Sequence, residues 1–443
     1  MNRLGARIEP LRGLLYDRRT VRDLARVLAP PYDVISEVQQ RDLYERSPYN
    51  VVRLELGRDA DRYASAQATL REWIERGVLR RAEQPSIFLY TQRFQVEGRK
   101  FVRSGFVVRF RLEDFARGRV LPHEKTFPAP KEDRLKLLAA TRTNISSIFG
   151  LYSGSNLELD RLRAEVMSRA PLIEADDSLG IRNELRAIAA PDEIATVQNA
   201  LESPQVLIAD GHHRYETSLN FRDECRTQAG MANPDAPYER SMMTFINTRS
   251  EGLTILPTHR VVANLRDFSW SLVRRYLEPW FTTEVLSFRN PNQRLEAQEK
   301  VLKHLADGQR RRAIAAYPAA DAASRAFYVL TLRPEANLAQ ILPGLSPLQR
   351  ELDVVLLHQG ILEPALGITP HAVSSEANLT YEREAAAALE AVDRGDAQVA
   401  FLLNPVEVDL VMKVATAGEV MPQKSTDFYP KLLSGITMYR VAE

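Results

Sequence analysis

Cysteine is almost absent from this sequence. One cysteine, Cys225, occurs among 443 residues, which excludes a disulfide framework and any zinc or iron–sulfur site built from several cysteines. A chain with so little cysteine fits a reducing compartment, and we expect a cytoplasmic protein. No segment approaches the roughly 20 consecutive apolar residues that cross a bilayer, and the N-terminus lacks the apolar core of a signal peptide. We therefore expect no membrane partner.

An excess of charge of one sign is also missing. The 59 Lys and Arg residues almost balance the 58 Asp and Glu residues, which leaves a net charge of +1. Such a chain has no global electrostatic attraction for DNA, RNA or an anionic membrane. The sequence also shows no helix-turn-helix pattern with a basic recognition helix. We therefore expect no nucleic-acid partner.

The length and the pattern of apolar residues indicate a mixed α/β protein of several domains. A chain of 443 residues is about three times the usual length of one domain. Short apolar runs typical of strands alternate with amphipathic helical patterns, which favours layered α/β structure. We place the divisions near residues 115 and 265. The expected domains are thus an N-terminal α/β unit (1–115), a core (116–265) and a C-terminal α/β domain (266–443).

Several elements are predicted from local patterns. Two β-rich runs in residues 86–112 flank a turn at 96–99 and predict a hairpin, and residues 63–74 have the apolar spacing of an amphipathic helix. Residues 50–56 read as a strand. Residues 404–407, Asn-Pro-Val-Glu, read as a helix start that is capped by the Asn and has Pro at its first position.

The most informative motif lies where an apolar strand, residues 206–209, runs into Asp210, Gly211, His212, His213 and Arg214. A helix that starts there directs its free N–H groups and its dipole at the loop, which favours a phosphate group. Gly211 lets the phosphate approach the backbone, and Arg214 can clamp it in a bidentate manner. Asp210 suits Mg²⁺ or a ribose hydroxyl. The alternative is a polar helix start with two surface histidines.

Two further segments carry polar groups that fit a reaction centre. His123, Glu124 and Lys125 precede a predicted helix at 131–138; the first two can supply a general base and Lys125 can meet a phosphate. The alternative is a solvated loop.

The other segment, residues 421–431, offers cations and hydroxyl donors for a phosphate or a carboxylate, from Lys424, Ser425, Thr426 and Lys431. The alternative here is a structural turn.

Together these segments resemble a bacterial and archaeal family of proteins, the domain of unknown function numbered 1015. The resemblance covers nearly the full length through residues 29–36, 50–56, 122–126, 144–152, 208–216, 256–260 and 421–431. The family name implies no activity.

A remoter resemblance does imply an activity. The string from Asp210 to Arg214 is similar to the nucleotide motif of free-serine kinases on the ParB/sulfiredoxin fold, in which a His-Glu pair and a helix come first. The same order occurs here, although the stretch between the motifs is longer. The resemblance implies a ParB/sulfiredoxin-like nucleotide-binding core, with Glu124 as the base and residues 210–214 as the phosphate cradle.

The leading hypothesis is a kinase that uses ATP or ADP with Mg²⁺ and phosphorylates a small hydroxylated metabolite, with free L-serine the first acceptor to consider. Catalysis would fall to Glu124, His123 and Asp210, with the metal on Asp210, so residues 123–126 and 210–214 should lie in one cleft. A nucleotide-switched binding protein of the ParB type and a phosphate-ester hydrolase are the alternatives. The sequence leaves the oligomeric state open.

The balanced charge leads to a prediction about DNA. We expect no useful binding to duplex DNA at physiological salt, because the chain lacks the cationic surface that releases counterions from phosphates. A gel-shift titration with a random duplex measures this. Submicromolar binding that weakens with added salt would contradict the prediction and favour the switch protein.

Overall fold

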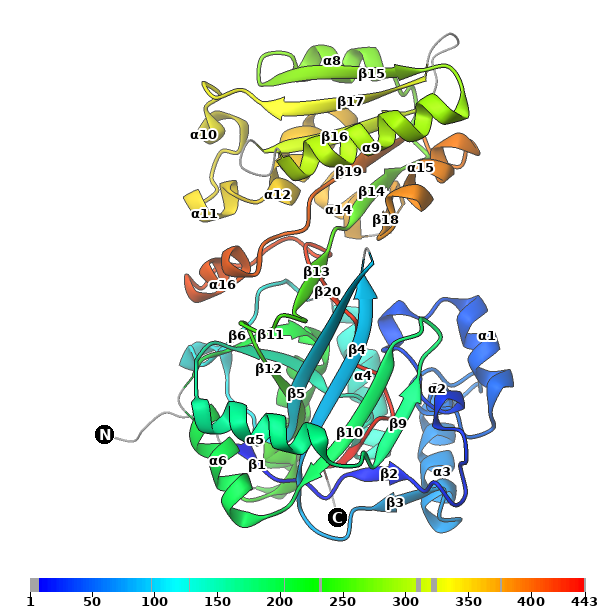
Figure 1. Cartoon of the computed structure of the whole chain (residues 1–443), viewed down its shortest axis with the longest axis vertical. Coiled ribbons are helices and arrows are strands. Elements are labelled where there is room, and N and C mark those ends of the chain that lie inside the picture. The colour runs from blue at the N-terminus through cyan, green and yellow to red at the C-terminus, as the bar shows by residue number, and fades with distance from the viewer. Residues whose placement is uncertain are drawn as a thin grey trace. The chain divides into compact units, whose positions relative to one another are not determined.

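The chain folds into two compact units. The structure is a computed structural model and describes residues 8–96, 98–126, 128–202, 204–230, 233–307, 312–319, 325–374 and 377–441. The first unit comprises Met1–Thr254 and Phe428–Glu443, and the second comprises Ile255–Asp427. The chain therefore leaves the first unit near residue 254 and returns to it for its last segment (Figure 1).

A nine-stranded mixed sheet organises the described part of the first unit. Its strands, in spatial order, are β6 (Val120–Leu121), β11 (Val206–Asp210), β8 (Ile148–Tyr152), β12 (Arg240–Asn247), β5 (Arg99–Arg111), β4 (Ile87–Val96), β10 (Arg182–Ile188) and β9 (Ile173–Asp176), and β1 (Ile8–Glu9) also pairs with β5. Two small sheets pair β2 (Leu14–Tyr16) with β3 (Leu79–Arg81) and β7 (Thr143–Asn144) with β21 (Tyr439–Arg440).

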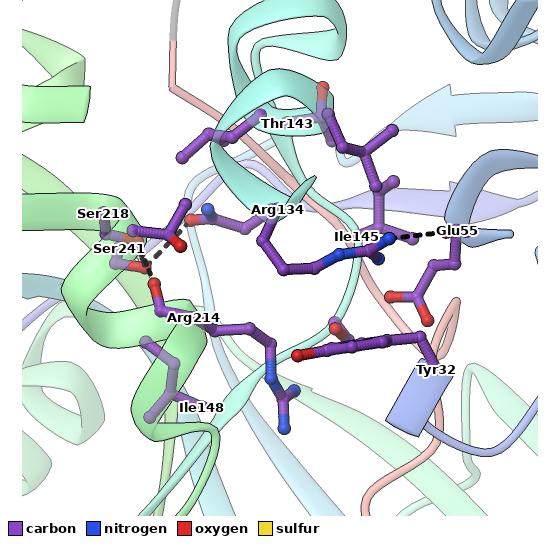
Figure 2. A pocket seen from close by; sticks show the side chains of 14 residues that line it. Tyr32, Glu55, Arg134, Thr143, Ile145, Ile148, Arg214, Ser218 and Ser241 are labelled. Carbon is purple, nitrogen blue, oxygen red and sulfur yellow. Dashed lines mark hydrogen bonds between the residues drawn. The ribbon is translucent and has the colours of Figure 1, made fainter. Parts of the chain in front are cut away.

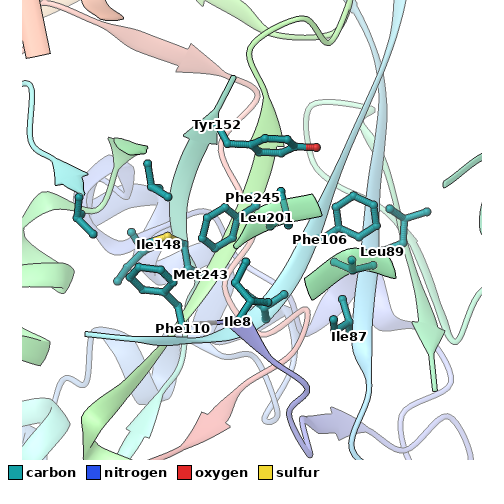
Figure 3. Packing of buried hydrophobic residues seen from close by; sticks show 14 of the residues in the cluster. Ile8, Ile87, Leu89, Phe106, Phe110, Ile148, Tyr152, Leu201, Met243 and Phe245 are labelled. Atoms are coloured by element: carbon teal, nitrogen blue, oxygen red, sulfur yellow. The ribbon is translucent and has the colours of Figure 1, made fainter. Parts of the chain in front are cut away.

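Seven α-helices of the first unit lie in the described residues: α1 (Glu37–Arg46), α2 (Val52–Glu55), α3 (Arg62–Glu75), α4 (Pro128–Thr141), α5 (Leu157–Ser168), α6 (Pro191–Leu201) and α7 (His212–Ala229). Apolar residues of α5, α6 and α7 pack with the sheet in one buried cluster, part of which is shown in Figure 3. Helix α4 packs against α3 and α7. No helix among the described residues is both long and apolar enough to cross a bilayer.

The second unit has its own six-stranded sheet and core. The strands, in spatial order, are β15 (Phe281–Phe288), β17 (Arg325–Leu332), β16 (Ala313–Pro318), β19 (Val399–Leu402), β14 (His259–Val262) and β18 (Leu379–Glu382). Its helices are α8 (Trp270–Leu277), α9 (Pro291–Asp307), α10 (Leu338–Ile341), α11 (Pro347–Arg350), α12 (Asp353–Leu357), α13 (Glu363–Leu366), α14 (Pro370–Ser374), α15 (Ala385–Asp393) and α16 (Val408–Thr416). β13 (Thr254–Leu256) and β20 (Asp427–Tyr429) span the two points where the chain changes units.

The expected mixed α/β class is confirmed, as are the hairpin of β4 and β5 and the amphipathic helix α3. The expected division into three domains differs from the structure. A boundary near residue 115 would separate β4 and β5 from β10 and β12, with which they form one hydrogen-bonded sheet. The last 16 residues, 428–443, belong to the first unit rather than to a C-terminal domain.

Two local predictions are wrong. Residues 50–56 contain helix α2 instead of a strand, because the Asn50 side chain accepts a hydrogen bond from the Val52 N–H at 3.0 Å and starts a helical turn. Asn404 does not cap a helix: its amide donates to the carbonyl oxygen of Leu305 at 2.8 Å, and α16 begins only at Val408.

The contact of β5 with β12 predicts that Gly105→Ala destabilises the first unit. A Cβ atom at Gly105 would lie 2.6 Å from Ile246 Cγ1 and 2.8 Å from Thr244 Cγ2. Relieving this overlap should cost about 1–3 kcal/mol of the free energy of unfolding, measured by urea denaturation. Gly154→Ala is the control, because nothing lies within 4 Å of its Cβ position. Equal stability of the two variants would contradict the packing described here.

Candidate active site

Two adjacent parallel strands bring the two main motifs together. Strand β11 pairs in parallel with β6, with Val206 opposite Val120 and Leu207 opposite Leu121. Parallel neighbours end at the same edge of a sheet, so the loop after β6 and the loop after β11 start side by side. The loop after β6 carries His123, Glu124 and Lys125, and α7 follows β11 directly. Residues 123–126 and 210–214 therefore lie close together, and that they share one cleft stays a prediction.

His123 and His212 join these two loops. The backbone N–H of His123 donates to His212 Nε2 at 3.3 Å, and His123 Nδ1 lies 2.6 Å from the carbonyl oxygen of Ile208. A carbonyl only accepts, so His123 carries its proton on Nδ1. Burial lowers the pKa of His123 to about 4 and that of His212 well below its ordinary value. Both rings are therefore neutral near pH 7.

This placement changes the role expected for His123. Its side chain is fully buried, with an exposed fraction of 0%, and its ring contacts that of His212 at a centroid distance of 4.6 Å. A side chain that is enclosed in this way holds the loop to β11 and does not reach a substrate. His123 is thus a positioning residue rather than a catalytic one.

Asp210 is a buried carboxylate held between two cations. Its Oδ1 accepts a hydrogen bond from Lys431 Nζ at 2.9 Å, and its Oδ2 accepts one from Arg214 Nη2 at 2.5 Å. Burial raises the pKa of Asp210, but the positive charges of Lys431 and Arg214 outweigh it and hold the pKa well below its usual range. Lys431, expected at a substrate, is thus an ion-pair partner of Asp210.

The surroundings of Asp210 do not fit a magnesium site. Each of its oxygens already accepts from a positively charged side chain, and a cation bound there would lie next to both charges. Among the described residues, no group of three or more His, Cys, Asp and Glu side chains could hold a metal ion. The expected metal role of Asp210 therefore has no support from the donor set.

Arg214 is engaged by the protein rather than open for a bidentate clamp. Besides the bond to Asp210, its Nη1 donates to the carbonyl oxygen of Ser147 at 2.6 Å, and within the described residues only its buried Nε lacks a partner. Gly211 makes room for this arrangement. It has a φ of 92°, and a Cβ atom there would lie 3.0 Å from the guanidinium of Arg214.

The N-terminus of α7 keeps the features of an anion site. No side chain caps it, because Gly211 occupies the N-cap position. Its first turn presents backbone N–H groups and the positive end of the helix dipole. His213 in this turn is half-buried, and burial lowers its pKa. Lys125, on the neighbouring loop, is exposed.

Glu216 is a residue of this site that the sequence argument did not single out. Its carboxylate accepts from Thr126 Oγ1 at 2.8 Å and from Lys131 Nζ at 2.7 Å. It therefore ties α7 to the loop after β6 and to α4. Glu124, on that loop, is partly exposed, at 18% of its side chain, and its Oε1 lies 3.8 Å from His123 Nε2.

Lys424, Ser425 and Thr426 belong to the second unit, whereas Lys431 belongs to the first. Ser425 Oγ donates to the carbonyl oxygen of Pro422 at 2.5 Å, and the carbonyl oxygen of Lys424 accepts from Arg260 Nη2 at 3.0 Å. These bonds describe a well-anchored turn. The four residues expected to form one substrate loop are thus divided between the two units.

A small cavity lies beside Arg214 (Figure 2). Its volume is about 50 Å³, measured as the space open to the centres of water molecules. The lining residues are Tyr32, Glu55, Arg134, Leu137, Leu138, Thr143, Asn144, Ile145, Ser146, Ile148, Arg214, Thr217, Ser218 and Ser241. The sequence analysis did not predict Tyr32, Glu55 or Arg134 as site residues, because each stands in a segment without a recognisable binding motif.

Comparisons with known proteins relate the chain to one family. The sequence model of the family described as "Protein of unknown function (DUF1015)" matches residues 8–355. Curated proteins gave no match.

Solved structures with a distant likeness include a conserved hypothetical protein from Pyrococcus furiosus (14% identity, 74% of this chain and 92% of that chain, TM-score 0.32). A mutant free serine kinase in complex with ADP has 13% identity, coverage of 75% and 92%, and a TM-score of 0.34. A C-terminally truncated SbnI from Staphylococcus aureus has 10% identity, coverage of 72% and 82%, and a TM-score of 0.33.

The environment of His123 predicts an unusual titration. With its pKa lowered to about 4, the ring should show little protonation between pH 8 and pH 5.5, where an ordinary histidine becomes about 90% charged. Its imidazole signals in NMR spectra, assigned by their loss in His123→Gln, measure this. Because the unfolded chain binds this proton more readily, stability contributed by neutral His123 should fall as the pH drops from about 6.5 towards about 4. A midpoint near 6.5 would contradict the buried placement.

Proposed function

The chain belongs to the DUF1015 family, whose description states no activity, and we propose that it is a nucleotide-dependent phosphotransferase acting on a hydroxyl group of a small metabolite. The observation that carries this proposal is the convergence of two loops after β6 and β11. One loop brings a partly exposed carboxylate, Glu124, and the other starts the uncapped helix α7. A base and a phosphate-binding helix terminus side by side are the two parts that phosphoryl transfer needs most.

The N-terminus of α7 is the phosphate site in this proposal. Backbone N–H groups after Gly211 would bind the phosphate oxygens of ATP or ADP, and exposed Lys125 would add a positive charge. Asp210 has an indirect part. By pairing with Lys431 and Arg214 it fixes two cations beside the start of the helix. In this proposal Arg214 acts on the phosphate through its positive charge and its position, rather than through a bidentate hydrogen bond.

Glu124 is the general base in this proposal. The acceptor hydroxyl oxygen forms a bond to the terminal phosphorus of the nucleotide while the bond from that phosphorus to the bridging oxygen breaks. The hydroxyl proton passes to the Glu124 carboxylate, and the nucleotide leaves with one phosphate fewer. Free L-serine is the first acceptor to test, because the order of the His-Glu and Asp-Gly-His-His-Arg motifs resembles that of free-serine kinases.

Glu124→Gln should separate binding from chemistry. The substitution keeps the size of the side chain and removes the base, so turnover should fall by about 100-fold or more while nucleotide affinity is retained. The assay incubates purified protein with ATP, ADP or CTP and a metabolite panel that includes L-serine, and detects new phosphoesters by mass spectrometry. Calorimetry with the same nucleotides gives the affinity.

Glu132→Gln is the matched control, since Glu132 is exposed on α4 and, in the described part of the chain, its one ion pair is with Lys136. It should leave both quantities unchanged. Undiminished turnover in Glu124→Gln would remove Glu124 as the base. Release of inorganic phosphate without any phosphoester would identify water as the acceptor and favour the hydrolase.

A further inference from the structure

Glu55 is a buried carboxylate without an ionic partner. Its exposed fraction is 4%, and Ser434 Oγ donates to its Oε2 at 2.9 Å. Within the described residues Oε1 accepts no hydrogen bond, and no Lys, Arg or His nitrogen comes within ion-pair distance of the carboxylate. A charge buried in this way is costly unless something compensates it.

The other buried glutamates of the first unit have such compensation. In the described residues there are three more, and each bonds an arginine: Glu113 with Arg119, Glu184 with Arg186, and Glu239 with Arg226. Glu55 is the exception, and it is also the one that lines the cavity beside Arg214. In Figure 2 its carboxylate lies on the side of the cavity where Tyr32 and Arg134 stand.

The rest of the cavity wall combines positive charge, neutral polar groups and apolar side chains such as Leu137 and Ile148. Arg134 is 6% exposed, and its guanidinium stacks on the Tyr32 ring at 4.1 Å. Its Nε and Nη2 bond to Asp133, and Nη2 also donates to the backbone carbonyl oxygen of Glu55 at 3.1 Å, whereas Nη1 makes no hydrogen bond within the described residues. The hydroxyl groups of Ser218 and Ser241 lie on the other side. Within the described residues, the cavity thus combines a carboxylate that forms no ion pair with a guanidinium group whose Nη1 makes no hydrogen bond.

We propose that this cavity binds a small amino acid, with the ligand's ammonium group on Glu55 and its carboxylate on Arg134. An ammonium group supplies the positive charge and the donors that Glu55 lacks, and Arg134 Nη1 can donate to a carboxylate. The space of about 50 Å³ holds roughly four water molecules, which suits a small metabolite and is too little for a nucleotide.

The inference deepens the proposed function and rests on it for one point, that the bound amino acid is the phosphoryl acceptor. Arg214 lines the cavity and also pairs with Asp210 at the start of α7. The cavity therefore adjoins the phosphate site, where an acceptor hydroxyl has to be held. The binding of the amino acid itself does not depend on phosphoryl transfer.

The test is a set of affinities measured by calorimetry on the full chain without nucleotide. L-Serine, L-glycerate and ethanolamine are the probes, because glycerate replaces the ammonium group by a hydroxyl and ethanolamine lacks the carboxylate. L-Serine should bind at least about 10-fold more tightly than either probe, the size of one charge-assisted hydrogen bond. The inference would be overturned if glycerate bound as tightly as serine. It would also be overturned if serine showed no binding at about 10 mM.

Two variants make the assignment specific to Glu55. Glu55→Gln keeps an acceptor for Ser434 but removes the charge, so the preference for L-serine over glycerate should shrink to within about threefold. Glu184→Gln, which changes another buried glutamate outside the cavity wall, should keep the full preference. An unchanged preference in folded Glu55→Gln, judged by circular dichroism, would place the ammonium group elsewhere and overturn the proposal.

The outcomes also separate this inference from the proposed function. Glu55-dependent serine binding with no phosphoester formed from any nucleotide would support the amino-acid site and contradict the kinase. Phosphorylation of acceptors without an ammonium group, at rates unaffected by Glu55→Gln, would support the kinase and contradict the amino-acid site.

Discussion

The ion-paired carboxylate of Asp210 is the constraint on which the candidate site depends. A carboxylate at the largely buried end of strand β11 is costly unless cations accompany it. One cation, Arg214, comes from the next helical turn, and the other, Lys431, comes from a segment 221 residues further along the chain. The pairing gives a physical reason for the last residues to return to the first unit after the second unit has been completed.

The neutral histidine pair extends this constraint to the loop after β6. Since His123 and His212 are both buried and uncharged, each can form hydrogen bonds inside the protein without needing a counterion. His123 fixes its loop to the carbonyl of Ile208, and Glu216 fixes the same loop through Thr126. The loop is therefore held at both ends of the 123–126 segment. Glu124, between these anchors, is left as the partly exposed carboxylate, an arrangement that suits a residue that has to meet a substrate.

The two carboxylates near Arg214, Asp210 and Glu55, have different partners, and only Glu55 lines the cavity. Asp210 is fully compensated by the protein, whereas Glu55 is buried with only a hydroxyl donor. An ion pair offsets the desolvation of its buried charges, whereas a buried carboxylate without an ion pair is costly unless a positively charged group binds it. Arg214 stands between these two carboxylates and belongs to both environments. The proposed phosphate site and the proposed acceptor site can therefore both adjoin Arg214 while they bind their ligands through different residues.

Short-range chemistry was readable from the sequence by itself. The hairpin of β4 and β5, helix α3 and the strand–glycine–helix junction at Gly211 follow from periodicity and turn residues, which act over a few positions. Residues 123–125 and 210–214 could also be chosen as candidate site residues from the sequence, because a phosphate site depends on local backbone geometry. What the tertiary structure decided is non-local. Long-range strand pairing gives domain boundaries that differ from those expected from the sequence. The burial of His123 assigns it a positioning role. Lys431 belongs to a different unit from residues 424–426 and forms an ion pair with Asp210. Burial likewise singled out Glu55: in the sequence it is one glutamate among many, and only the packed structure shows that, within the described residues, no cationic nitrogen lies within ion-pair distance of its carboxylate.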